Sequence, residues 1–251
     1  MINTKSFYLT DTGRVREHNE DSVTILKNMN GEYLLVVADG MGGHRKGEVA
    51  SALTVTHLGK RFTESASIGT KIDAVNWLSD NINEINREIL DYGEKNENSK
   101  GLGTTVVAAI VTKEFLIFAN IGDSSGYVMK NNKLHRVTKP HTLVNLLVDA
   151  GDLTEEQAKT HPKKNVLMKA LGAAEKAEPD IFDVDNGSTE VFLCSDGVTS
   201  LLNDDQIEKV LLETNLTIEE RVIKLIKKCN ARGGTDNISI AYLVRESGDI
   251  A

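Results

Sequence analysis

Short apolar runs, rich in β-branched and aromatic residues, recur along the chain and predict β-strands. They occupy residues 22–27, 33–38, 104–111, 115–121, 126–129, 190–194 and 238–244. Turn sequences join neighbouring runs, KNMNGE at 27–32 and KNNK at 130–133. Such short connections suit hairpins, whereas parallel strands need long crossovers. The pattern therefore predicts sheets that are mainly antiparallel.

Longer segments with apolar residues at intervals of three and four predict helices. The clearest is 72–92, where apolar residues from Val75 to Ile89 form one stripe, and 47–62 shows a similar pattern. Two further helices are expected at 204–213 and 217–231. Strands packed as a sandwich with helices outside are an α+β arrangement. Because no linker, charge block or repeat divides the 251 residues, we expect a single domain spanning 1–251.

Composition narrows the possible functions. The net charge of −8 argues against a nucleic-acid partner and against a basic membrane-binding face. The first residues lack the apolar core of a signal peptide, and no apolar run is long enough to span a bilayer. Cys194 and Cys229 are too few for a disulfide framework, so we expect a cytoplasmic protein without membrane insertion.

Acidic residues stand at the ends of apolar runs in four separate segments. Glu20 and Asp21 precede the first run, Asp39 follows the second, Asp196 follows 190–194, and Asp236 precedes 238–244. One acid beside a strand is ordinary turn chemistry, but four such placements at one edge of the sandwich favour a cluster. Like charges at about 4 Å repel by roughly 4 kcal/mol at an effective dielectric of about 20. Such a cluster therefore requires protons or cations.

The donors available in this cluster are oxygen atoms, from the carboxylates and from the carbonyl that Gly40 could expose. Oxygen-only coordination favours Mg²⁺ or Mn²⁺ over zinc, and no EF-hand loop supports calcium. Two neighbouring divalent ions can activate a water and clamp an in-line displacement at phosphorus. Arg16, four residues before Glu20, could bind a phosphate through its guanidinium, although a surface ion pair is the simpler interpretation of Arg16 alone.

Six short motifs occur together in one order. They are RxxxED (Arg16, Glu20, Asp21), ADGMGGH (38–44), GLGTT (101–105), IGDS (121–124), CSDG (194–197) and GGTDN (233–237). In order and approximate spacing, from about Thr10 to Val244, they resemble the metal-dependent PP2C-type (PPM) protein phosphatases, compact bacterial branch. The resemblance implies an αββα sandwich. It also implies a phosphoric monoester hydrolase acting on phosphoserine and phosphothreonine in proteins.

The resemblance further implies a metal site. Asp39 would bridge two Mn²⁺ or Mg²⁺ ions, Gly40 would contribute its carbonyl, and Asp196 and Asp236 would complete the shell of the first ion. Asp123 would help to bind a third, weaker ion.

Other roles follow from the same resemblance. Glu20 and Asp21 would hold waters bound to the metals, and Arg16 would bind the substrate phosphate. A subdomain at about 142–175 would form a mobile flap beside the site.

The chain departs from the family pattern at several positions. Eukaryotic relatives have His where this chain has Met41, so the acid that protonates the leaving group is unassigned. His44 lies nearby, but a turn histidine is more often a structural hydrogen-bonding residue. Bacterial relatives usually carry Arg at the position of Ser125 and Asp at that of Pro140, so substrate handling could differ here.

Three functions are compatible with these residues. An active phosphoprotein phosphatase is favoured because Asp39, Asp196 and Asp236 are all present. A catalytically silent binding module on the same fold and a hydrolase of another phosphoester are the alternatives. By resemblance, the expected partners are phosphorylated proteins and a cognate Ser/Thr kinase, and we expect a monomer.

Overall fold

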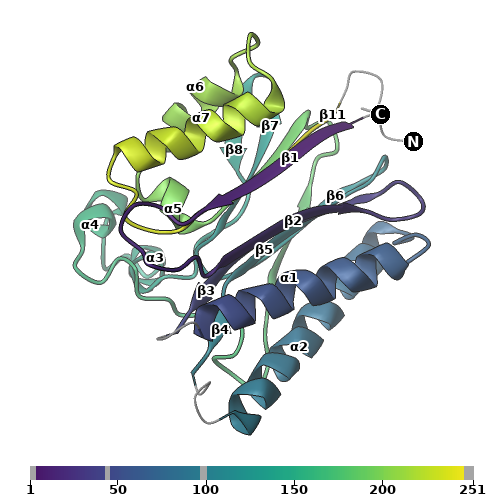
Figure 1. Ribbon diagram of the computed structural model, residues 1–251, viewed down its shortest axis with the longest axis horizontal. Coiled ribbons are helices and arrows are strands. Elements are labelled where there is room, and N and C mark those ends of the chain that lie inside the picture. Colours follow the sequence, from purple (N-terminus) through teal and green to yellow (C-terminus); the bar gives the residue numbers. More distant parts are fainter. Residues whose placement is uncertain (1–3, 43–45, 97–100, 246–251) are drawn as a thin grey trace.

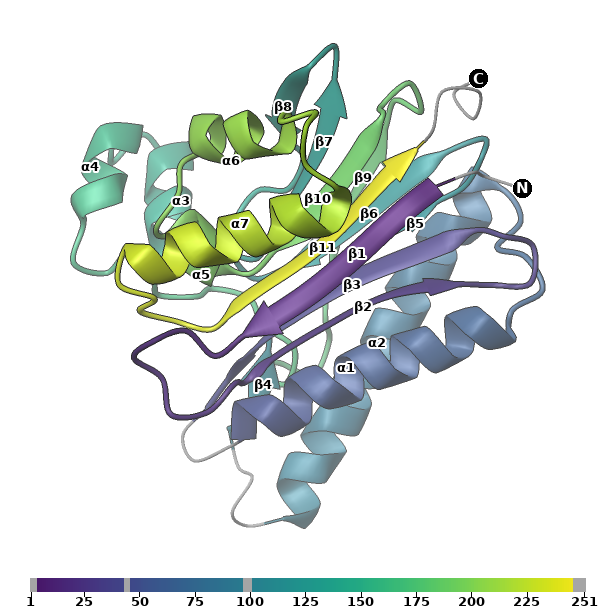
Figure 2. The same ribbon diagram turned by 45° about the horizontal axis from the view of Figure 1, so that its top comes forward.

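Two antiparallel sheets lie face to face, with helices covering both outer surfaces (Figures 1 and 2). The computed structural model describes residues 4–42, 46–96 and 101–245. The first sheet has the spatial order β1 (Thr4–Asp11), β11 (Ile238–Arg245), β10 (Glu190–Cys194), β7 (Ser125–Lys130) and β8 (Lys133–Arg136). The second has the order β2 (Asp21–Lys27), β3 (Tyr33–Met41), β5 (Val106–Val111), β6 (Leu116–Ile121) and β9 (Asp180–Val184), with β4 (Gly103–Thr104) paired to β3.

The helices divide between the two outer surfaces. The second sheet is covered by α1 (Lys46–Glu64) and α2 (Lys71–Lys95), and the first by α6 (Asp204–Leu211) and α7 (Ile218–Ala231) (Figure 2). The short helix α5 (Asp196–Thr199) follows β10 directly. This arrangement confirms the predicted αββα sandwich, and the strand pairs described here are antiparallel as expected.

Three apolar layers hold the sandwich together. Successive side chains of a strand point to opposite faces, so on β3 Leu34 packs toward the helices while Leu35 packs between the sheets. On β10, Phe192 faces the α6 and α7 side and Leu193 faces the layer between the sheets. Burial on both faces explains why the central strands are continuous apolar runs in the sequence.

Capping residues set where the predicted helices begin. Thr70, Asn203 and Thr217 each accept a hydrogen bond from the backbone three residues later in a reciprocal capping box. Such a box satisfies two of the backbone donors that a helix start leaves unpaired. The helix predicted at 217–231 therefore starts at Ile218, with Thr217 as its cap.

The sequence pattern missed three strands, and all three lie at sheet edges. β1, β8 and β9 each have one neighbour in their sheet and expose much of their surface. These three edge strands mix polar and apolar residues, so their apolar runs are too weak to identify, unlike that of the edge strand β2. The short helices α3 (Leu143–Asp149) and α4 (Glu155–Thr160) were also not predicted individually.

Helices α3 and α4 belong to the segment predicted as a flap. They lie at the end of the sandwich where the β1–β2 connection and α5 also lie (Figures 1 and 2). Thr142 caps α3, and Thr154 with Gln157 forms a capping box for α4. The mobility of this segment stays a prediction. Across the described parts of the chain, we find no helix with the length and apolarity needed to cross a bilayer.

Candidate active site

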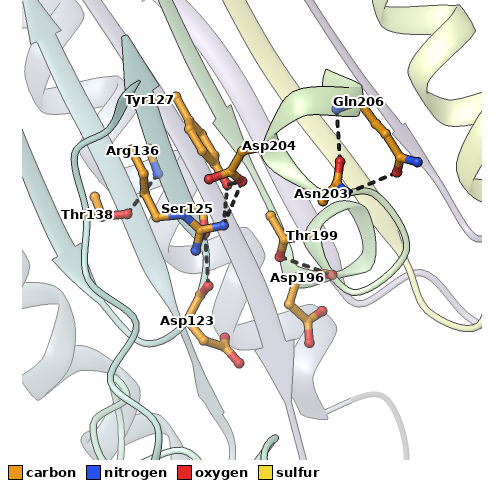
Figure 3. A network of polar contacts seen from close by, with 11 residues as sticks. Asp123, Ser125, Tyr127, Arg136, Thr138, Asp196, Thr199, Asn203, Asp204 and Gln206 are labelled. Atoms are coloured by element: carbon orange, nitrogen blue, oxygen red, sulfur yellow. Dashed lines mark hydrogen bonds and ion pairs between the residues drawn. The ribbon is translucent and has the colours of Figure 1, made fainter. Parts of the chain in front are cut away.

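Four strand ends bring the predicted acids to one end of the sandwich. Asp21 opens β2 and is the direct cross-strand partner of Asp39 near the end of β3. Asp196 starts α5 immediately after β10, and Asp236 lies just before β11, the strand next to β10. Asp123 lies in the turn between β6 and β7, and Figure 3 shows it close to Asp196. The structure therefore brings these acids together, as the sequence predicted.

Burial and mutual repulsion raise the pKa values of these carboxyl groups. For Asp39, burial and then the charges of Asp21 and Asp196 raise the pKa well above its ordinary value. Burial is also the main cause that raises the pKa of Asp21 to about 7 and that of Asp123 to about 7. The pKa of Asp196 is raised by burial and by Asp236. Charged carboxylates in this arrangement need cations for compensation.

The residues present fit a hard divalent ion. One oxygen of the Asp21 carboxyl accepts a hydrogen bond from Ser195 Oγ at 2.7 Å, whereas Asp21 Oδ1 is buried and has no protein partner among the described residues. At Gly40, a Cβ atom would lie 2.2 Å from the carbonyl oxygen of Gly47 and 2.5 Å from that of Glu20, so only glycine fits. Oxygen donors and an unpaired buried oxygen suit Mg²⁺ or Mn²⁺.

Carboxylates alone do not complete a coordination shell here. In residues 4–42, 46–96 and 101–245, no three acidic, histidine or cysteine side chains enclose a single point as a ready-made ligand set. Bound ions would therefore also take carbonyl and water oxygens, and Mg²⁺ in proteins usually keeps several waters.

Arg16 lies at the rim of the carboxylate cluster. Its Nη2 atom is 2.7 Å from Asp236 Oδ2, and 52% of its side chain is exposed. Partial burial alone would lower the pKa of Arg16, but Asp236, and to a lesser degree Asp39 and Asp196, raise it. The guanidinium is thus held beside the acids with much of its surface open. Arg16 therefore forms an ion pair with Asp236, and its exposed surface also allows contact with a bound phosphate.

Glu20 is fixed through its backbone. Its N–H donates to Asn237 Oδ1 at 2.9 Å, and its carbonyl accepts from Gly40 N at 3.1 Å and from Ser51 Oγ at 2.6 Å. Burial raises the pKa of the Glu20 carboxyl, while Arg16 opposes that rise.

Asp39 is held by threonines that the sequence marked only as letters of a motif. Asp39 N donates to Thr105 Oγ1 at 3.0 Å, and its carbonyl accepts from Thr105 N at 2.8 Å and from Thr104 Oγ1 at 2.9 Å. Thr105 Oγ1 also lies 2.8 Å from the hydroxyl of Ser124, the neighbour of Asp123. The GLGTT and IGDS motifs therefore position the acids.

Asn237 has a similar role on the other side of the site. Besides accepting from Glu20, its side-chain amide donates to the carbonyls of Thr12 and His18, each at 2.9 Å. Asn237 thus ties the 12–20 loop, which carries Arg16, to the start of β11. The only sequence signal for this role was its place in the GGTDN motif.

A guanidinium from a neighbouring strand lies beside Ser125, where bacterial relatives usually carry arginine. Arg136 on β8 approaches Ser125 Oγ at 3.4 Å and Asp204 Oδ1 at 3.1 Å (Figure 3). It also bonds the hydroxyl of Tyr127 and lies over that ring, 5.0 Å from the centroid. A guanidinium of β8 therefore lies beside position 125.

Met41 and His44 are the two positions that bear on the unassigned leaving-group acid. Met41 ends β3 and is 36% exposed beside the acids. His44 lies outside the described residues.

This chain is similar to known proteins over nearly its whole length. A family model described as protein phosphatase 2C matches residues 12–230. The serine/threonine phosphatase stp of Listeria welshimeri is 39% identical over 239 residues, covering 95% of this chain and 94% of that protein.

Solved structures are also similar to this chain over nearly its whole length. The serine/threonine phosphatase of S. agalactiae has a TM-score of 0.89 and 37% identity, covering 97% of this chain and 100% of that one. The serine/threonine phosphatase Stp1 of Staphylococcus aureus has a TM-score of 0.90 and 35% identity, covering 98% and 96%. The similarity thus extends over nearly the whole chain.

Proposed function

The chain belongs to the protein phosphatase 2C family and is a serine/threonine protein phosphatase, and we propose that its active site is the carboxylate cluster around Asp39. The family is metal-dependent, and binding metal ions is the role that we propose for the cluster. The observation that carries the proposal is the convergence of buried acids with mutually raised pKa values. Nearby Arg16 adds a partly open cation.

In this proposal each acid has a separate role in metal binding. Asp39 would hold both of two Mn²⁺ or Mg²⁺ ions, Asp196 and Asp236 would hold the first, and the Gly40 carbonyl would contribute one ligand. When bound, such ions would supply a water of lowered pKa for attack on phosphorus and would compensate charge on the phosphoryl oxygens. The threonine contacts to Asp39 keep its carboxylate in place without occupying it.

The remaining acids support this core. Asp21 and Glu20 would hold water molecules bound to the ions, and the unpaired Oδ1 of Asp21 is suited to that role. Asp123 contributes to a third, weaker site, consistent with its burial near Asp196.

Arg16 binds the phosphate of the substrate in this account. A guanidinium donates to two oxygens of one phosphate at once. Substrate phosphate would compete with Asp236 for Arg16, so binding would loosen the ion pair seen here.

The biological setting extends the same proposal. The natural substrates are phosphorylated proteins, and a cognate Ser/Thr kinase is expected to supply the phosphate groups that this enzyme removes. We also propose a monomeric, cytoplasmic enzyme in which residues of about 142–175 form a flap beside the site.

Metal removal and restoration test the function directly. Purified protein is treated with a chelator, and hydrolysis of a phosphothreonine peptide is then measured without added metal, with Mn²⁺ and with Mg²⁺. We expect activity to be lost and then restored by Mn²⁺ or Mg²⁺. Undiminished activity in the chelator would exclude metal catalysis, and an absence of hydrolysis both before chelation and with each of the two ions would favour the silent binding module.

A further inference from the structure

The turn that carries Asp123 is held from outside the carboxylate cluster by a histidine. His141 N donates to the carbonyl of Gly122 at 2.8 Å, and Gly122 N donates to His141 Nδ1 at 3.1 Å. Gly122 directly precedes Asp123 and has a φ of 105°, a conformation that favours glycine. One residue therefore makes two reciprocal contacts to the backbone beside Asp123.

The imidazole of His141 also reaches the far side of the turn. Its side chain is 10% exposed, and Nε2 lies 3.0 Å from Asp180 Oδ2, a close contact that is poorly aligned for a hydrogen bond. Because Nδ1 accepts from Gly122, the ring proton belongs on Nε2, facing the Asp180 carboxylate. Asp180 also pairs with Lys169 at 3.1 Å. Partial burial raises the pKa of Asp180, but contacts with His141 and Lys169 lower it overall.

These contacts close the base of the segment that contains α3 and α4. Met168 N donates to the carbonyl of His141 at 2.8 Å, and Thr142 pairs with Leu167. At its other end the segment is tied to the core, because Leu171 and Thr104 exchange backbone hydrogen bonds at 2.9 and 3.2 Å. Thr104 in turn donates to the carbonyl of Asp39. Both ends of the segment therefore contact residues that hold a site acid.

We propose that His141 is a positioning residue that couples the segment 141–172 to the Asp123 turn through its Nδ1 contact with Gly122. The inference rests on the proposed role of Asp123 in the phosphatase site. In this account a displacement of the segment changes the position of Asp123. This role depends on the Nδ1 acceptor of the imidazole and not on the volume of the ring.

Two substitutions of His141 separate its two contacts. His141→Asn places a polar oxygen near the position of Nδ1 and can keep the contact with Gly122, while it loses Asp180. His141→Gln places its amide near the position of Nε2 and keeps Asp180, while it loses the acceptor for Gly122. His57, which pairs with Glu88 on the helix surface, supplies matched controls as His57→Asn and His57→Gln.

Two readouts are compared, hydrogen exchange of the Gly122 amide in metal-free protein and kcat/KM for a phosphothreonine peptide with Mn²⁺. We expect His141→Gln to exchange faster and to lose activity, each by about fivefold or more, since one hydrogen bond to buried backbone is lost. His141→Asn should stay closer to the wild type in both, and the His57 variants should not change either. Equal behaviour of the Asn and Gln variants would overturn the proposal.

A chemical rescue covers the case in which the Gln variant does not fold. Imidazole added to His141→Ala should slow Gly122 exchange and recover activity, and a lack of recovery would count against the proposal. Asp123→Asn distinguishes this inference from the proposed function. If Asp123→Asn leaves Mn²⁺ activation unchanged, the role of Asp123 is wrong. If Asp123→Asn impairs Mn²⁺ activation but the Asn and Gln variants of His141 behave alike, the role of Asp123 stands and only the proposed coupling through His141 is wrong.

Discussion

Arg16 pairs with Asp236 in the structure and would bind the substrate phosphate in the proposed mechanism. If Arg16 binds phosphate as proposed, its replacement by Ala would remove a charge-assisted contact, and such a contact contributes about 1.5–3 kcal/mol. We therefore predict a rise in KM for a phosphothreonine peptide of roughly tenfold or more, with a smaller effect on kcat. Steady-state kinetics at saturating Mn²⁺ provide the measurement. Arg14→Ala, in the same loop, is the control, and an unchanged KM in Arg16→Ala would leave only the ion pair with Asp236.

Arg136 changes the expectation for Ser125. Ser125 is fully buried, and its hydroxyl lies between the Asp123 carbonyl and Arg136, each at 3.4 Å. Ser125→Arg alone would place a second guanidinium beside the first. We predict that it destabilises the protein and that adding Arg136→Ser recovers part of the loss, with a coupling of about 1–2 kcal/mol. Urea unfolding of both single variants and the double variant measures this coupling, and strictly additive changes would show that the two positions are independent.

At the scale of elements, Glu32 joins the β2–β3 turn to the α1–α2 connection. The residue is 6% exposed, and its carboxylate accepts from Asn28, Asn30, Ser67 and the backbone N–H of Ile68. Burial alone would raise its pKa, but these donors lower it below the ordinary value of 4.5. These contacts connect two segments at the end of the sandwich opposite the acids.

The direction of this pKa shift fixes how stability depends on pH. Because the folded pKa of Glu32 is lowered, its contribution is present above the unfolded pKa and is lost as pH falls through the folded value. Glu32→Gln should therefore cost roughly 1–3 kcal/mol of unfolding free energy at pH 7 and less in the acid range below about pH 4. Denaturant titrations at both pH values test this. Exposed Glu114→Gln is the control, and a cost independent of pH would mean that the charge of Glu32 is not what matters.

Elements differ in how far the sequence reveals them. Central strands such as β3 and β10 are buried on both faces, so their apolar runs predicted them correctly. Edge strand β9 pairs on one side only and carries Asp180 and Asp183 among its few apolar residues, so no run marked it. The helices α3 and α4 were also not predicted, because helices this short do not show a stripe of apolar residues.

At the scale of the whole molecule, the sequence predicted the acids better than the residues that hold them. Asp39 and Asp196 were identified because each follows an apolar strand and begins an Asp-Gly pair. The links from Thr105 to Asp39 and from His141 to Gly122 join segments far apart in the chain. Their partners are set by strand pairing and by the packing of loops, which local pattern does not encode. Arg136 was missed for the same reason, since only strand pairing places it beside Ser125.

If Asp39 holds the metal ions used for catalysis, Mn²⁺-dependent hydrolysis of a phosphothreonine peptide by Asp39→Asn is the most direct measurement of that role. Losing metal-based stabilisation of about 4 kcal/mol lowers the rate by about a thousandfold. Exposed Asp183→Asn, which only breaks a surface pair with Lys71, serves as the control and should keep normal turnover. We predict that folded Asp39→Asn loses at least this factor in kcat at saturating Mn²⁺. Turnover of folded Asp39→Asn within a few-fold of the wild type would contradict the assignment.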